Sequence, residues 1–94
     1  MKDLTERVGL IAGDGVLPVE FIKTAKEENL SVIGVGLTQD SFNLLKSVID
    51  NSIFCPIGEP MRIVDYFKMH EVKDIGFAGK VDKRIIFHSK NDFD

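Results

Sequence analysis

Mainly apolar runs alternate with longer segments of helical periodicity along this chain. The run at residues 8–12 is apolar throughout, which is typical of a strand buried on both faces, as in a parallel sheet. Between such runs, residues like Ile63, Val64 and Phe67 recur at the spacing of one helix face. The pattern predicts four strands, at residues 8–12, 31–36, 51–55 and 72–78. It predicts three helices, at residues 18–29, 40–49 and 58–72.

Single residues indicate where the helices begin and which side they bury. Pro18 suits the first position of its helix, and Leu17, Phe21 and Ala25 follow at four-residue spacing on one face. Asp40 suits the N-cap of the second helix, because its carboxylate can accept from the first free amides. These residues predict the helix starts.

Other residues have structural interpretations. Met61 and Met69 are interpreted as core residues of the third helix, and His70 as a cation that closes its C-terminus. Gly34 and Gly36 inside the second strand indicate the close approach of a packed helix rather than of a ligand.

Strands that alternate with helices of this length predict right-handed crossovers and a parallel sheet covered on both faces. We therefore expect an α/β fold, a small Rossmann-like doubly wound parallel sheet with four strands in the order 3-2-1-4 and three helices. In such sheets ligands bind beyond the carboxyl ends of the strands, where the winding reverses. That point lies between the first strand, which ends in "AGDG", and the fourth, which ends in "AGK".

The stretch "GLIAGDGVLP", residues 9–18, resembles a nucleotide-binding turn but departs from the known fingerprints. Pro18 stands where a dinucleotide site has its third glycine, no acid follows near residue 33, and no Gly-Lys-Ser/Thr completes a P-loop. A general anion site remains. Gly13 and Gly15 permit unusual backbone angles, and the amides of Asp14, Gly15 and Val16 precede a helix, where an anion is stabilised. A plain tight turn is the alternative.

Two charged residues belong to this prediction. Asp14 would repel a phosphate unless a cation lay between them, so it either caps the helix, faces solvent or ligates a metal. Lys80 follows the fourth strand and is expected beside the first loop, where its charge could contact a phosphate. A solvated surface lysine is the alternative interpretation of Lys80.

Composition narrows the class of protein. The 94 residues suffice for one small domain, and 44% hydrophobic with 29% charged residues is ordinary for a globular protein. The single Cys55 rules out a disulfide within the chain and is interpreted as a small buried residue. The two histidines, His70 and His88, have no partners at ligand spacing, so we expect no metal site.

Charge and hydropathy bear on location and partners. The net charge is -3, and no basic cluster extends beyond "KVDKR", so a nucleic-acid partner is not expected. No apolar run reaches the ~20 residues that a membrane helix requires. The N-terminus "MKDLTERVGLIAG" does not fit a signal peptide. We therefore expect a cytoplasmic protein.

Three stretches together carry a resemblance to a known family. They are "GLIAGDGVLP", "IGEPMRIVDYFKMHEVKDIGFAGKV" and "IIFHSKNDFD". In this order and spacing they resemble the N-terminal domain of the LpxI-type UDP-2,3-diacylglucosamine pyrophosphatases, over nearly the whole chain. The resemblance implies hydrolysis of UDP-2,3-diacylglucosamine to UMP and 2,3-diacylglucosamine 1-phosphate in lipid A synthesis, with Mg2+ or Mn2+ and attack of water on the α-phosphorus.

The resemblance also implies which residues face the substrate. Family enzymes carry their acidic catalytic and metal-binding residues in a C-terminal domain, so no catalytic residue and no bound metal are expected in this chain, and the chain alone is expected to be inactive. Residues 1–84 are expected to form the Rossmann-like domain, and residues 85–94 an exit segment toward that catalytic domain. The matched positions that would line the cleft are Gly13, Asp14, Gly15, Leu17, Ala78, Gly79 and Lys80.

Two classes of function stay open at this point. The chain is either the substrate-binding half of this enzyme, reaching the inner-membrane surface only through its lipid substrate, or a stand-alone nucleotide-binding or protein-interaction module without catalysis. A homodimer is an open option in either case.

Overall fold

The computed structural model describes residues 6–56 and 58–80. They form one sheet with three helices, as the sequence predicts. In chain order the elements are β1 (Arg7–Ala12), α1 (Leu17–Glu27), β2 (Ser31–Gly36), α2 (Gln39–Val48), β3 (Asn51–Phe54), α3 (Pro60–Met69) and β4 (Asp74–Ala78).

The four described strands lie in the order β3-β2-β1-β4 and all pair in parallel. The predicted order 3-2-1-4 and the α/β class are therefore confirmed. Ala12 at the end of β1 pairs with Gly36 of β2 on one side and with Ala78 of β4 on the other. This register brings the carboxyl ends of β1, β2 and β4 to one edge of the sheet.

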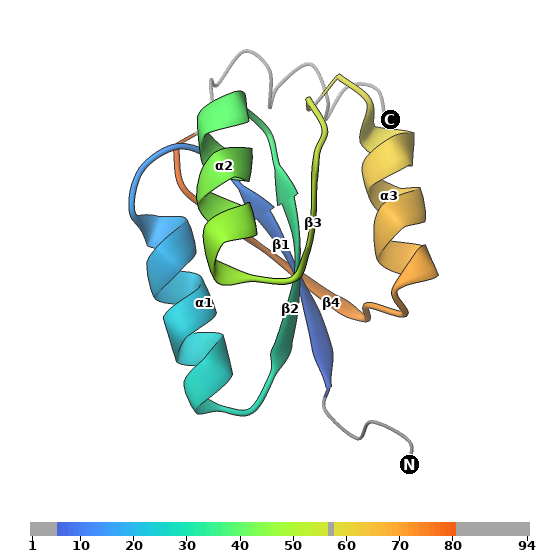
Figure 1. Cartoon of the computed structure of the whole chain (residues 1–94). Coiled ribbons are helices and arrows are strands. Elements are labelled where there is room, and N and C mark those ends of the chain that lie inside the picture. Colours follow the sequence, from blue (N-terminus) through green and yellow to red (C-terminus); the bar gives the residue numbers. More distant parts are fainter. Residues whose placement is uncertain (1–5, 57, 81–94) are drawn as a thin grey trace.

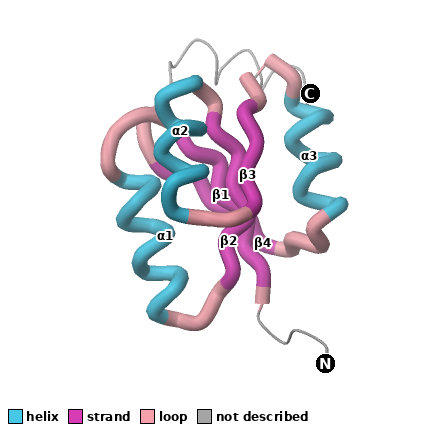
Figure 2. The backbone as a smooth tube through the Cα atoms, in the orientation of Figure 1, coloured by secondary structure: helices cyan, strands magenta, loops and turns pink. Residues whose placement is uncertain are grey.

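The helices cover both faces of the sheet. Figure 1 shows α1 and α2 on one side of the strands and α3 on the other, and Figure 2 shows the same three layers. Each layer boundary holds a hydrophobic core. Leu10, Ile22 and Leu45 belong to the core under α1 and α2, whereas Ile33 and Phe67 belong to the core under α3.

The glycines of β2 permit the close approach that the sequence indicated. A Cβ atom on Gly36 would lie 2.5 Å from the backbone N and Cα of Phe42 in α2. A Cβ on Gly34 would lie 2.8 Å from the Cδ1 of Ile49. The interpretation as contacts with a packed helix is confirmed, and α2 lies directly against the sheet.

Several details differ from the sequence predictions. The N-cap of α2 is Thr38 and not Asp40, because the Thr38 hydroxyl accepts from the Ser41 amide in a reciprocal capping box. In α1, Ala25 is buried as predicted and the partly buried Phe21 packs against the same core, but Leu17 is exposed. Pro18 and Ile22 are buried in addition, so the buried face is wider than the predicted stripe and centred beside it.

The two methionines of α3 are not core residues. Met61 and Met69 are 62% and 69% exposed. The buried residues of this helix are Ile63 and Phe67, and the partly buried Tyr66 packs against the same core. His70 is the C-cap of α3, as expected from its position. Cys55 follows β3 and is fully buried, which confirms its interpretation as a small core residue.

Candidate functional site

The loops after β1 and β4 meet at the carboxyl edge of the sheet. The Gly13 amide donates to the Ala78 carbonyl at 2.8 Å. Asp14 and Lys80 then form an antiparallel bridge, with N–H to O distances of 3.0 Å from Asp14 and 2.8 Å from Lys80. The predicted meeting of the two loops is confirmed. We call residues 13–15 and 78–80 the loop junction.

Gly79 is the residue that permits this junction. Its φ of +104° lies where side chains are rarely tolerated, and a Cβ there would lie 2.6 Å from the carbonyl carbon of Gly13. The carbonyl oxygens of Gly13 and Asp14 would lie within 2.9 Å of the same Cβ. All these atoms belong to the backbone, which cannot rotate away as a side chain can. The two loops can therefore approach this closely only with glycine at position 79.

The start of α1 offers backbone donors beside the junction. Its N-cap, Val16, supplies no side-chain cap, and the amides of Gly15 and Val16 donate to no backbone carbonyl among the described residues. Gly15 has a φ of +103° and open space around its Cα. Free amides at the positive end of a helix stabilise an anion. The Asp14 amide, which the sequence grouped with them, is not free because it donates to Lys80.

The carboxylate of Asp14 points to a different helix from the one predicted. Its Oδ1 accepts a hydrogen bond of 2.6 Å from the Oγ1 of Thr38, the N-cap of α2. Of the alternatives for Asp14, capping of α1 is wrong, whereas exposure to solvent is confirmed. Thr38 was missed by the sequence analysis, although the Thr-x-x-Ser spacing of Thr38 and Ser41 resembles a capping box and could have marked it.

The side chain of Lys80 is exposed at the junction. Its backbone makes both hydrogen bonds to Asp14, so the junction does not depend on the side chain. Within residues 6–56 and 58–80 its ammonium group has no ion-pair partner, so as far as these residues go it can contact a ligand at this edge.

An apolar groove of about 460 Å³ lies next to the junction. It is lined by Ala78 of the junction and by Leu17 of α1. Leu17 is 58% exposed, and Phe77, which also lines the groove, is 63% exposed. The groove runs along α1 and β4, which places apolar surface next to the polar donors of the α1 start.

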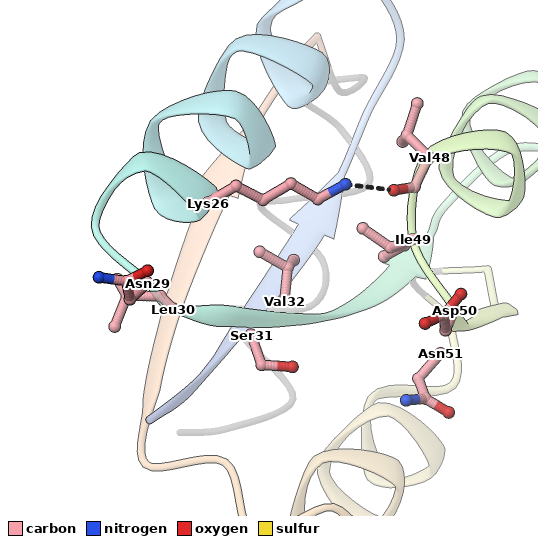
Figure 3. Close-up of a pocket in the computed structure, with 9 residues that line it drawn as sticks. All are labelled: Lys26, Asn29, Leu30, Ser31, Val32, Val48, Ile49, Asp50 and Asn51. Atoms are coloured by element: carbon pink, nitrogen blue, oxygen red, sulfur yellow. Dashed lines mark hydrogen bonds between the residues drawn. The ribbon is translucent and has the colours of Figure 1, made fainter. Parts of the chain in front are cut away.

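A second pocket, of about 380 Å³, lies at the opposite edge of the sheet, where α1 and α2 end (Figure 3). Lys26 spans it, and its Nζ donates to the Val48 carbonyl at 2.9 Å. The ammonium group thus satisfies a carbonyl at the C-terminus of α2, a role that supports the packing of the two helices. This pocket contains none of the predicted site residues.

The described residues do not form a metal centre. No group of three or more His, Cys, Asp or Glu residues within 6–56 and 58–80 is arranged to hold an ion. Asp14 is the one carboxylate of the loop junction, and it is bonded to Thr38.

The match of the chain to a family model decides its family. The model of the LpxI N-terminal domain matches residues 7–94. The chain belongs to the LpxI N-terminal domain family. No curated protein and no solved structure matches it. None of the helices described for this LpxI N-terminal domain is long and apolar enough to cross a membrane.

Proposed function

We propose that this LpxI N-terminal domain binds the UDP part of UDP-2,3-diacylglucosamine for a pyrophosphatase of lipid A synthesis. The observation that carries the proposal is the loop junction, where free amides, a positive helix end and an exposed lysine lie at the switch point of the sheet. Family membership supports the choice of substrate.

In this proposal the diphosphate lies over the start of α1. The amides of Gly15 and Val16 donate to its oxygens, and Lys80 adds a positive charge from the other loop. Leu17 and Ala78 form the neighbouring apolar wall of the cleft. The domain orients the substrate and supplies no catalytic group.

Hydrolysis is assigned to a C-terminal catalytic domain that closes the cleft and brings the ligands for Mg2+ or Mn2+. The products are UMP and 2,3-diacylglucosamine 1-phosphate. Because the substrate is a lipid, the enzyme would work in the cytoplasm at the surface of the inner membrane. The stand-alone module remains the rival function, and it is favoured if no acidic domain follows Asp94 in the gene.

Titration of the chain with UDP, followed through backbone amide signals, tests the proposal. Signals of Gly15, Val16, Gly79 and Lys80 should shift, with millimolar or weaker affinity because one wall of the cleft is outside this chain. Shifts confined to residues 51–54 at another strand end, or no shifts with UDP, would reject the proposed site.

A further inference from the structure

Asp14 lies two residues before Val16, the N-cap of α1. Aspartate side chains in such loops commonly accept from the amide two residues further on, which would occupy the start of the helix. In this structure α1 has no side-chain cap, and the Asp14 carboxylate accepts from Thr38 instead. The choice between these two partners decides whether the α1 amides are open to a ligand.

The hydrogen bonds around Thr38 fix the direction of its hydroxyl proton. The Ser41 amide donates to the Oγ1 of Thr38 at 3.1 Å, and the Ser41 hydroxyl donates to the Thr38 carbonyl at 3.1 Å. The Thr38 amide in turn donates to the Ser41 Oγ at 3.0 Å. The Ser41 Oγ lies 3.1 Å from the Thr38 Oγ1 and is a second possible acceptor. The Asp14 carboxylate is closer, at 2.6 Å, and is charged, so it is the stronger acceptor for the one hydroxyl proton of Thr38.

The bond to Asp14 is short and is made to a charged group. At 2.6 Å, the distance between the two oxygens is in the range of charge-assisted O–H to carboxylate bonds. The carboxylate also lies at the N-terminus of α2, where the helix dipole stabilises negative charge. These two effects hold the Asp14 side chain on α2.

We propose that Thr38 is a positioning residue for the UDP site, an inference that rests on the proposed function. Its hydroxyl keeps the Asp14 carboxylate away from the α1 amides. The amides stay open to a phosphate, and the negative charge of Asp14 is held at the second helix. Thr38 thereby allows an acidic residue to occupy a phosphate-binding loop.

The test compares UDP affinities of four variants, measured from amide shifts at a temperature where all of them are folded. Thr38→Val removes the hydroxyl and should weaken UDP binding roughly 3- to 10-fold, the range of one net hydrogen bond. Thr38→Ser keeps the hydroxyl and should bind UDP like the natural chain. Without ligand, the Val16 amide signal of Thr38→Val should move from its position in the natural chain, and this change should be absent when Asp14→Ala is added.

The double variant separates positioning from helix capping. Asp14→Ala removes the carboxylate, so adding Thr38→Val to it should have no further effect on UDP affinity. If the loss persists in the Asp14→Ala background, Thr38 acts through the fold of α2 and the inference is wrong. Unchanged binding by Thr38→Val overturns the inference alone, whereas a natural chain that does not respond to UDP overturns the proposed function first.

Discussion

Gly79 lies so close to Gly13 that a Cβ atom on it would be 2.6 Å from the Gly13 carbonyl carbon. The contact joins the ends of β1 and β4, two strands separated by most of the chain. The geometry of the proposed site and the stability of the fold therefore depend on the same residue.

Gly79→Ala should lower the free energy of unfolding by at least about 1 to 3 kcal/mol, the cost of a strained backbone conformation, with the steric contact in addition. Gly15→Ala has a similar φ but open space, and it should cost only about 1 to 2 kcal/mol. Urea unfolding measures both. Gly58→Ala is the control, since its φ is not positive and its Cβ would contact nothing described, so its stability should hardly change. Equal stability of the Gly79 and Gly58 variants would contradict the account of the junction.

Alanine substitutions at Thr38 and Asp40 test which of the two residues is the N-cap of α2, as the structure and the sequence respectively indicate. Thr38→Ala removes the capping box and should cost about 1 kcal/mol of unfolding free energy. Asp40→Ala removes only a favourable charge in the first turn and should cost about 0.3 to 0.5 kcal/mol. Thermal unfolding of the two variants shows which substitution lowers the stability more. The reverse order would restore Asp40 as the cap.

Lys80→Ala should leave stability within about 0.5 kcal/mol, because the side chain is exposed and the junction uses only its backbone. Loss of one charge-assisted contact should weaken UDP binding roughly 10-fold or more. Lys80→Met should behave in the same way, since it keeps the length but not the charge. Lys73→Ala is a matched control on an exposed lysine before β4, and its UDP affinity should equal that of the natural chain. Full UDP affinity in both Lys80 variants would leave Lys80 as a surface residue.

If the proposed enzyme joins this domain to a catalytic domain, Lys80→Ala in that enzyme should reduce kcat/KM by about 10- to 150-fold, the effect of losing a diphosphate contact worth about 1.5 to 3 kcal/mol. Steady-state kinetics with UDP-2,3-diacylglucosamine measures this, and an unchanged kcat/KM would exclude the contact.

The 94-residue chain with Mg2+ or Mn2+ should release no UMP from UDP-2,3-diacylglucosamine, because its described residues bring together no set of metal ligands. Chromatography of the nucleotide products measures this. Turnover above a protein-free control that survives repurification would show catalytic groups in this chain.

Cys55 should make the fold less stable at alkaline pH. Burial raises the pKa of its thiol, the nearby Arg62 lowers it and Glu59 raises it, with a net increase. A group whose pKa is raised on folding contributes stability below its unfolded pKa and loses that contribution as the pH rises through the folded pKa. The urea midpoint should therefore fall above about pH 8.5, the ordinary thiol range. In Cys55→Ala this alkaline fall should be smaller. The part that remains is due to the partly buried Tyr66, whose pKa is raised by burial. An identical pH profile in both proteins would exclude the thiol as the cause.

The fold could be predicted because it follows from patterns along the chain. Apolar runs and helical periodicity located every strand, and the handedness of parallel crossovers fixed their order. The meeting of the loops after β1 and β4, seen in the bridge between Asp14 and Lys80, followed from that order. At the start of α1 the sequence chose Leu17 where Pro18 is buried, because the two are adjacent apolar residues and either fits a 3.6-residue period.

The side-chain partners could not be predicted in the same way. Asp14 and Thr38 are 24 residues apart, and their bond depends on the rotamer of a side chain in a loop. Met61 and Met69 were misplaced because one helix covers this face, and Ile63 with Phe67 already fills the strip of sheet beneath it. The sequence pattern shows which residues of a helix are apolar. The width of the sheet surface that the helix covers decides which of those residues are buried.

The bridge between Asp14 and Lys80 is antiparallel, although every strand pair in the sheet is parallel. At this bridge the chain that leaves β4 runs opposite to the chain that leaves β1, and the two stay hydrogen-bonded beyond the strand ends. Lys80 is thereby held at the edge of the proposed ligand site. If the catalytic domain of the proposed function lies on the same chain, its closure over a bound nucleotide is an encounter within one molecule, for which short linkers give millimolar effective concentrations. A shallow site with weak contacts of its own then suffices, because the tethered domain supplies the second wall.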